Sequence, residues 1–201
     1  MNLPNKISIT RICMIPIFVL IFFLDGILPF NYGIAAIIFA LAACTDFIDG
    51  YIARSRGLVT NLGKFLDPIA DKVLVATAMI LLLTMQDTLF ALFGQLQAIV
   101  YIVTTIFICV ILARELIISA FRQIAAAGGV VMAADKLGKY KTTFQDVAIF
   151  VLIFAVNLPL SVANVFAYVG IALFTVATVL TVWSGISYVI KNKQVLQDKK
   201  D

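Results

Sequence analysis

The stretch DFIDGYIARSRGLVTNLGKFLDPIAD, residues 46–71, holds four of the 11 acidic residues of the chain between long apolar runs. Asp46 and Asp49 are three positions apart, and Asp67 and Asp71 are four positions apart. On a helix, either spacing places both carboxylates on one face. The flanking apolar runs predict two antiparallel helices joined by a short connection, so that the two acidic faces can meet.

The rest of the 201-residue chain is unusually apolar, with 63% hydrophobic residues, 13% charged residues and a mean hydropathy of +1.08. Soluble domains contain roughly 45–50% apolar residues. The composition therefore excludes a soluble enzyme, a nucleic-acid-binding protein and a disordered chain. The absence of histidine excludes Ser-His-Asp triads and histidine-ligated zinc. The three cysteines lie singly in apolar runs and are predicted to be small buried hydrophobes.

The hydrophobic runs predict an all-α membrane protein with six transmembrane helices, because a bilayer core needs about 20 apolar residues per helix. We expect a short N-terminal interfacial segment at residues 2–6, a single transmembrane domain over residues 1–190 and a basic cytoplasmic tail at 191–201. Asp67 and Asp71 are expected at the start of the third span, and Pro68 is tolerated if that span begins just before it, with Asp67 near the cap; the starting residue stays open. The six runs are 12–24, 33–52, 73–85, 98–120, 147–156 and 162–190.

The charges are distributed unevenly over the predicted connections. All 15 Lys and Arg residues lie toward one side of the topology, and the opposite connections carry only Asp25 and Asp87. The positive-inside rule places the cations, the acidic cluster and both termini in the cytoplasm. Because no transit peptide is visible, we expect a bacterial inner membrane.

The acidic cluster predicts a site for a hard metal ion. An acid in the middle of a membrane costs roughly 2.5–3.5 kcal/mol, and a divalent cation offsets the repulsion among four of them. Oxygen ligands without histidine or cysteine favour Mg²⁺, Mn²⁺ or Ca²⁺ over zinc. Plainer interpretations stay open, in which the acids pair with nearby cations and the small residues pack helices. The interleaved Gly50, Ala53 and Gly63 leave room for a bulky ligand, and Arg54 suits phosphate oxygens.

One pattern joins these residues: Asp46-x2-Asp49-Gly50-x2-Ala53-Arg54-x8-Gly63-x3-Asp67-x3-Asp71. It resembles the signature of the CDP-alcohol phosphatidyltransferase family at all eight positions. The stretches 5–11, 114–119 and 136–142 look like the bacterial branch of that family whose acceptor is glycerol 3-phosphate. The resemblance covers most of the chain and thins in the last two spans.

The resemblance implies a six-helix homodimer with the CDP-alcohol phosphatidyltransferase fold and a cavity open to the cytoplasm. Such an enzyme would transfer the phosphatidyl group of CDP-diacylglycerol to glycerol 3-phosphate and release CMP, with one or two Mg²⁺ or Mn²⁺ ions as cofactors. The four acids Asp46, Asp49, Asp67 and Asp71 would hold the metal, and Asp71 would also be the base. The CDP-diacylglycerol site would comprise Asp49, Gly50, Ala53, Arg54 and Gly63.

An acceptor with a phosphate dianion needs cations near the same end of the molecule. Our candidates for binding glycerol 3-phosphate are Thr10, Arg11, Arg114, Lys139 and Lys141. Alternatively, such cations snorkel to the interface as anchors. Adjacent residues on a helix do not face each other, so Glu115 is expected to pair with Arg11 or Lys139. Lys72 is expected to balance the acidic cluster.

Two other functions remain open at this stage. A sibling enzyme would use another acceptor alcohol, such as inositol phosphate, serine or phosphatidylglycerol. A cation-coupled transporter would also place acids inside the membrane. The acids here lie at one edge of the predicted bundle and no internal repeat is visible, which favours the transferase.

Overall fold

The computed structural model describes residues 3–56, 61–127 and 136–192, and side chains for residues 6–45, 66, 69–125 and 138–192. The described ranges contain no strand, which confirms the prediction of an all-α chain. They form α1 (Leu3–Phe22), α2 (Asn31–Arg56), α3 (Asn61–Leu83), the 3-10 helix η1 (Phe90–Leu96), α4 (Gln97–Ala127), α5 (Lys136–Ala155) and α6 (Leu160–Lys191). Of the predicted tail at 191–201, only Lys191 and Asn192 are described.

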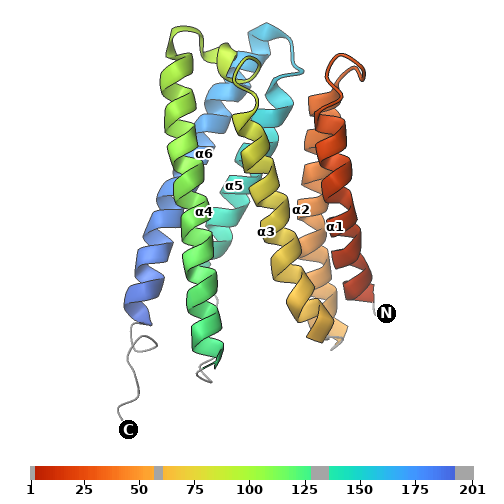
Figure 1. Ribbon diagram of the computed structural model, residues 1–201, viewed down its shortest axis with the longest axis vertical. Coiled ribbons are helices and arrows are strands. Elements are labelled where there is room, and N and C mark those ends of the chain that lie inside the picture. The colour runs from red at the N-terminus through yellow and green to blue at the C-terminus, as the bar shows by residue number, and fades with distance from the viewer. Residues whose placement is uncertain (1–2, 57–60, 128–135, 193–201) are drawn as a thin grey trace.

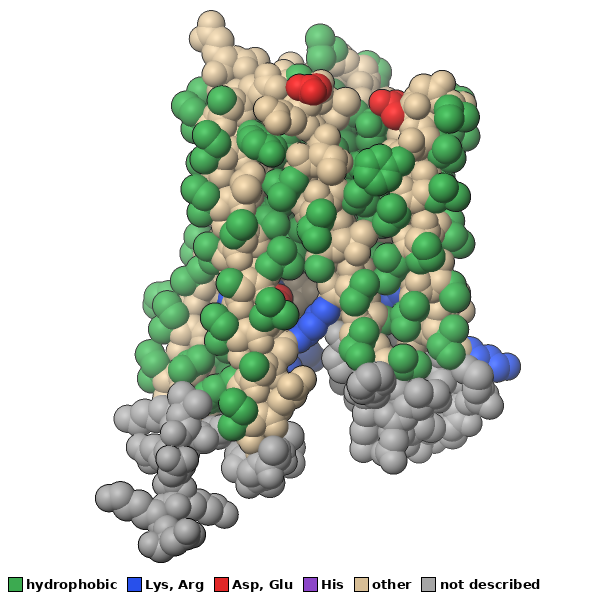
Figure 2. All heavy atoms as spheres, in the orientation of Figure 1, with side chains coloured by type: hydrophobic (Ala, Val, Ile, Leu, Met, Phe, Trp, Pro, Cys, Tyr) green, Lys and Arg blue, Asp and Glu red, His purple; other side chains and the backbone are tan. Residues whose placement is uncertain are grey.

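The helices run side by side along the long axis of the molecule (Figure 1). The connections at residues 23–30, 84–96 and 156–159 lie together at one end, which we call the closed end. The first and last described residues lie toward the other end, where α1, α3 and α5 begin and α2, α4 and α6 end. Figure 2 shows Lys and Arg side chains gathered in a hollow toward this second end, which we call the charged end.

The main hydrophobic core contains buried residues from all six α-helices and from η1. Helices α5 and α6 pack closely, because a Cβ atom on Gly170 would lie 2.6 Å from Cδ2 of Leu152. The outer surface is also apolar, and Trp183 on α6 is 68% exposed. All three cysteines are exposed, so the prediction that they are buried is wrong. An apolar run does not distinguish the inner from the outer face when both faces are apolar.

Two helices begin earlier than the apolar runs alone indicate. Residues 3–6 of the expected N-terminal interfacial segment are part of α1, which begins at Leu3, because proline is well tolerated in the first turn and Pro4 does not delay the helix; an interfacial position of this segment stays a prediction. Helix α3 begins at Asn61, so Pro68 and Asp67 lie inside it. An interior proline removes one backbone hydrogen bond but does not always end a helix.

The described helices differ in how well they suit a membrane. The stretch Phe90–Ala125 and helix α6 are long and apolar enough to cross a bilayer by length and composition. The apolar part of α2, Asn31–Thr45, is shorter. For the other helices, a transmembrane course stays a prediction.

At the closed end, polar side chains join neighbouring connections. Nδ2 of Asn31 donates to the carbonyl oxygen of Phe22 at 2.9 Å, and the backbone N–H of Gly33 donates to Oδ1 of Asn157 at 2.7 Å. A Cβ atom on Gly33 would lie 2.1 Å from Cε1 of Phe30, so a larger residue there would require the Phe30 ring to move. These contacts tie the start of α2 to α1 and to the α5–α6 connection.

Candidate active site

The four predicted metal ligands lie on two helices that contact each other near the charged end. Asp46 and Asp49 are on α2, and Asp67 and Asp71 are on α3. Of these, only Asp71 has a described side chain, which is half-buried. The remaining predicted metal and CDP-diacylglycerol residues have side chains outside the described set, so their roles stay predictions: Asp46, Asp49, Gly50, Ala53, Arg54, Gly63 and Asp67.

Asp71 lines a cavity of about 290 Å³ between α3, α4 and α5. Charged residues from all three helices share this wall, and apolar residues complete it. The cavity therefore brings a carboxylate and ammonium groups to one small space. Its described lining comprises Asp71, Lys72, Val75, Ala76, Met79, Leu112, Glu115, Leu116, Lys141, Thr142 and Gln145.

Glu115 is the centre of an ion-pair network in this wall. Its Oε1 accepts from Nη1 of Arg114 at 2.9 Å and pairs with Nζ of Lys141. The Lys141 side chain is only 6% exposed, so Glu115 neutralises a nearly buried cation. The prediction that Glu115 pairs with Arg11 or Lys139 is wrong. The Arg114 side chain is long enough to turn back along the helix to its neighbour.

Lys72 connects α3 to α4 one turn further along. Its Nζ donates to Oγ of Ser119, which lies four residues after Glu115 on the same helix face. The two lysines therefore approach α4 from different helices, Lys72 from α3 and Lys141 from α5. Together with Arg114, which lies outside the lining of the cavity, they give the described part of this network three cations against the two carboxylates of Asp71 and Glu115. Such a surplus favours an anionic ligand.

Arg11 holds α1 against α2. Its side chain is fully buried, and its Nε donates to the carbonyl oxygen of Ala42 and to Oγ1 of Thr45, both at 3.1 Å. Thr45 directly precedes Asp46 in the chain, and Ala42 lies four positions before it. The structure thus places Arg11 beside the segment that carries the first acidic pair.

The remaining predicted acceptor-site residues lie in different settings. Oγ1 of Thr10 donates to the carbonyl oxygen of Lys6 at 2.9 Å within α1. Lys139 is exposed at the start of α5. Of the five candidates, Lys141 is the one in the described wall of the Asp71 cavity, and Arg114 reaches it through Glu115.

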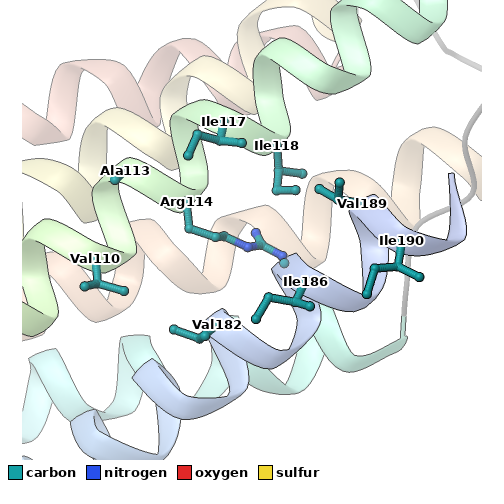
Figure 3. Close-up of a pocket in the computed structure, with 10 residues that line it drawn as sticks. Val110, Ala113, Arg114, Ile117, Ile118, Val182, Ile186, Val189 and Ile190 are labelled. Carbon is teal, nitrogen blue, oxygen red and sulfur yellow. The ribbon is translucent and has the colours of Figure 1, made fainter. Parts of the chain in front are cut away.

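Arg114 also forms the floor of a second hollow between α4 and α6 (Figure 3). Its Nη2 donates to Oγ of Ser184 at 3.0 Å, and a Cβ atom on Gly185 would lie 3.0 Å from its Cγ. The guanidinium therefore lies against the backbone of α6. The hollow measures about 500 Å³ and is otherwise apolar, with Val110, Ala113, Ile117, Ile118, Val182, Gly185, Ile186, Val189 and Ile190 around it.

The sequence reasoning missed three polar residues of this region: Ser119, Gln145 and Ser184. The sequence could have indicated Gln145, because it lies four residues after Lys141 and therefore on the same face of α5. Ser119 stands in the same relation to Glu115 on α4. No comparable spacing identifies Ser184, whose partner Arg114 is on another helix.

The protein is thus a helical bundle with a cavity near its charged end that is lined by Asp71, Lys72, Glu115 and Lys141. The family model described as CDP-alcohol phosphatidyltransferase matches residues 1–183, and the chain belongs to that family. Relatives from Bacillus subtilis (strain 168) and Escherichia coli (strain K12) are each 38% identical to 98% of the chain, over 97% and 98% of their own lengths. A Salmonella typhimurium (strain LT2) relative is 38% identical, with 98% of both chains covered. All three are named CDP-diacylglycerol--glycerol-3-phosphate 3-phosphatidyltransferase.

Proposed function

We propose that this chain transfers the phosphatidyl group of CDP-diacylglycerol to sn-glycerol 3-phosphate, giving phosphatidylglycerophosphate and CMP. The proposal rests on the relatives that are named for this activity, which are 38% identical to this chain over 98% of its length. The Asp71 cavity also supports it, because its described lining combines the carboxylates of Asp71 and Glu115 with the ammonium groups of Lys72 and Lys141 in a volume suited to a small alcohol phosphate.

Asp71 is the proposed general base. Its carboxylate accepts the proton of the primary hydroxyl of glycerol 3-phosphate, and the hydroxyl oxygen attacks the phosphorus that carries the diacylglycerol. The bond between that phosphorus and the oxygen of CMP breaks, and CMP leaves with the electron pair. A half-buried carboxylate in the wall of a small cavity suits this role, since a small acceptor can reach it there.

The acceptor phosphate is held by cations of the same wall. Lys141 and Lys72 approach the cavity from α5 and α3, and Arg114 adds its charge through the Glu115 network. Glu115 keeps these side chains in place without neutralising all of them. We also retain Thr10, Arg11 and Lys139 as acceptor-site candidates, with Arg11 acting beside Asp46 from α1.

The metal and CDP-diacylglycerol sites complete the proposal. Asp46, Asp49 and Asp67 would hold one or two Mg²⁺ or Mn²⁺ ions together with Asp71, and the oxygen-only donor set and the contact between α2 and α3 fit such ions. When bound, the metal would supply charge neutralisation on the attacking and leaving oxygens. Arg54 would contact the diphosphate, and Asp49, Gly50, Ala53 and Gly63 would line the nucleotide.

We further propose that all six helices span the bacterial inner membrane, with the charged end and both termini facing the cytoplasm. The apolar outer surface, including Leu20 at 64% and Ile99 at 61% exposure, supports contact with lipid. The acyl chains of the lipid substrate would then remain in the bilayer while its headgroup enters from the charged end. A homodimer is part of this proposal.

The test is release of CMP by the purified protein in detergent, with CDP-diacylglycerol, Mg²⁺ or Mn²⁺ and a panel of acceptors. We expect release with glycerol 3-phosphate. Release only with inositol phosphate, serine or phosphatidylglycerol would identify a sibling with another acceptor. No release with any acceptor would contradict the transferase proposal and leave a cation-coupled transporter to be tested.

A further inference from the structure

Gln145 is a buried polar residue of the Asp71 cavity for which the proposed chemistry has no use. Its side chain forms part of the cavity wall and is 3% exposed. The Oε1 atom has no hydrogen-bond partner, and the contact of Nε2 is Sδ of Met79 at 3.7 Å. A thioether sulfur is a weak acceptor. The amide is therefore poorly satisfied within the described part of the chain.

Leaving a buried amide without good partners is unfavourable, and native proteins rarely do so without a functional reason. The last torsion of glutamine is broad and roughly two-fold, so a rotation can turn either the oxygen or the nitrogen toward the cavity. A ligand that offers a hydroxyl group would complete the hydrogen bonds of this amide.

Among the described residues of the wall, Gln145 is the best suited to hydrogen-bond a neutral hydroxyl group of a ligand. Val75, Ala76, Met79, Leu112 and Leu116 offer no hydrogen bond of comparable strength. The hydroxyl of Thr142 already donates to the carbonyl oxygen of Gly138 at 3.0 Å. The charged residues suit the reacting hydroxyl and the phosphate, whereas a neutral carboxamide suits a neutral hydroxyl.

We propose that Gln145 recognises the secondary hydroxyl of the acceptor and thereby selects a glycerol phosphate over simpler alcohol phosphates. This inference rests on the proposed function. The primary hydroxyl goes to Asp71 and the phosphate goes to Lys141 and Lys72. The middle carbon then lies between them, and its hydroxyl hydrogen-bonds the carboxamide one helical turn beyond Lys141 on α5.

The test compares glycerol 3-phosphate with 3-hydroxypropyl phosphate, which keeps the primary hydroxyl and the phosphate but lacks the secondary hydroxyl. We expect the unmodified protein to prefer glycerol 3-phosphate by roughly 10- to 100-fold in kcat/KM. Gln145→Met, which has nearly the same volume, should lower kcat/KM for glycerol 3-phosphate by a similar factor and leave the analogue almost unaffected. The preference should therefore collapse toward one.

A matched control separates recognition from packing. Met79→Leu removes the sulfur beside Gln145 but keeps the amide, so the preference should persist. If Gln145→Met keeps the preference, or lowers both substrates equally, the proposal is overturned. If Gln145→Met does not fold, Gln145→Asn decides, because it withdraws the amide by one methylene and should weaken the preference; an unchanged preference would overturn the proposal. Failure of the proposed function is a separate result, namely no CMP release by the unmodified protein.

Discussion

The polar side chains at the closed end and at the charged end of the bundle differ in their hydrogen bonding. At the closed end, Asn31 and Asn157 bond to backbone groups of neighbouring connections, at 2.9 and 2.7 Å. At the charged end, Arg114, Glu115 and Lys141 form an ion-pair network beside the Asp71 cavity, but among the described residues Nε of Arg114 and Oε1 of Gln145 have no hydrogen-bond partner. Asn31 and Asn157 thus stabilise the fold at the closed end, whereas Nε of Arg114 and Oε1 of Gln145 are held ready for a ligand. Oδ1 of Asn164, near the start of α6, is also without a partner among the described residues.

This difference predicts that substitutions at the two ends affect different properties of the protein, namely turnover and the free energy of unfolding. Changes at the charged end should lower turnover more than the free energy of unfolding. Changes at the closed end should lower the free energy of unfolding and leave turnover intact. The variants below test this separation in order of expected effect.

The largest effect is expected from Asp71→Asn, which removes the proposed base while keeping the shape of the side chain. Turnover should fall by roughly 10²–10⁴-fold, because an amide cannot accept the proton of the acceptor. Metal-dependent binding of CDP-diacylglycerol should survive. The measurements are the rate of CMP release and equilibrium lipid binding, and a near-normal rate would show that Asp71 is not the base. Asp25→Asn at the closed end is the matched control and should leave the rate unchanged.

A smaller loss is expected from Glu115→Gln. It removes the negative partner of Arg114 and Lys141, so both cations lose their fixed positions beside the cavity. The expected cost is about 2 kcal/mol of transition-state stabilisation, or roughly 30-fold in kcat/KM for glycerol 3-phosphate. A double-mutant cycle with Lys141→Met should show strong non-additivity. Additive losses would mean that the ion pair does not position Lys141.

Asn157→Leu should affect stability alone. It removes the acceptor for the backbone N–H of Gly33, which costs about 1–2 kcal/mol in the free energy of unfolding. Thermal unfolding in detergent should show a lower midpoint, and kcat/KM should not change. Asn164→Leu is the matched control, since Oδ1 of Asn164 has no partner to lose. Loss of turnover in folded Asn157→Leu protein would contradict the separation of the two ends.

The smallest effect is expected from Arg122→Met, at the charged end but outside the Asp71 cavity. Arg122 is exposed, donates from Nε to the hydroxyl oxygen of Tyr188 at 3.2 Å and lies 5.3 Å from the centre of that ring. Loss of these contacts should cost about 0.5–1 kcal/mol in the free energy of unfolding. Turnover should stay within twofold of the unmodified protein. A large loss of turnover would extend the active region along α4.

The sequence predicted that the Lys and Arg residues lie at one end of the bundle, because the positions of these residues in the connections between apolar runs can be taken directly from the sequence. The described Lys and Arg residues do gather at one end, as Figure 2 shows, and the acidic motif led to the family that the comparison confirms. The motif also placed Asp71 correctly near the charged end. Its other side chains lie outside the described set, so the metal ligands remain predictions.

The pairing of side chains could not be predicted in the same way. Periodicity gives the helix face of Glu115, but not which rotamer lets Arg114 turn back to it or that α5 brings Lys141 against it. Pro68 did not indicate where α3 begins. Proline often lies at a helix start, but Pro68 lies inside α3, which begins at Asn61. Gln145 shares a face with Lys141, yet only the cavity shows that its amide lacks a partner.

The central claim is that the charged end catalyses phosphatidyl transfer to glycerol 3-phosphate. The most direct measurement follows radiolabelled glycerol 3-phosphate into lipid and counts CMP in the same reaction, with the purified protein, CDP-diacylglycerol and Mg²⁺ or Mn²⁺. We expect one CMP for each labelled phosphatidylglycerophosphate, and loss of both products when the metal is chelated. Labelled lipid without CMP, or neither product with metal present, would contradict the account.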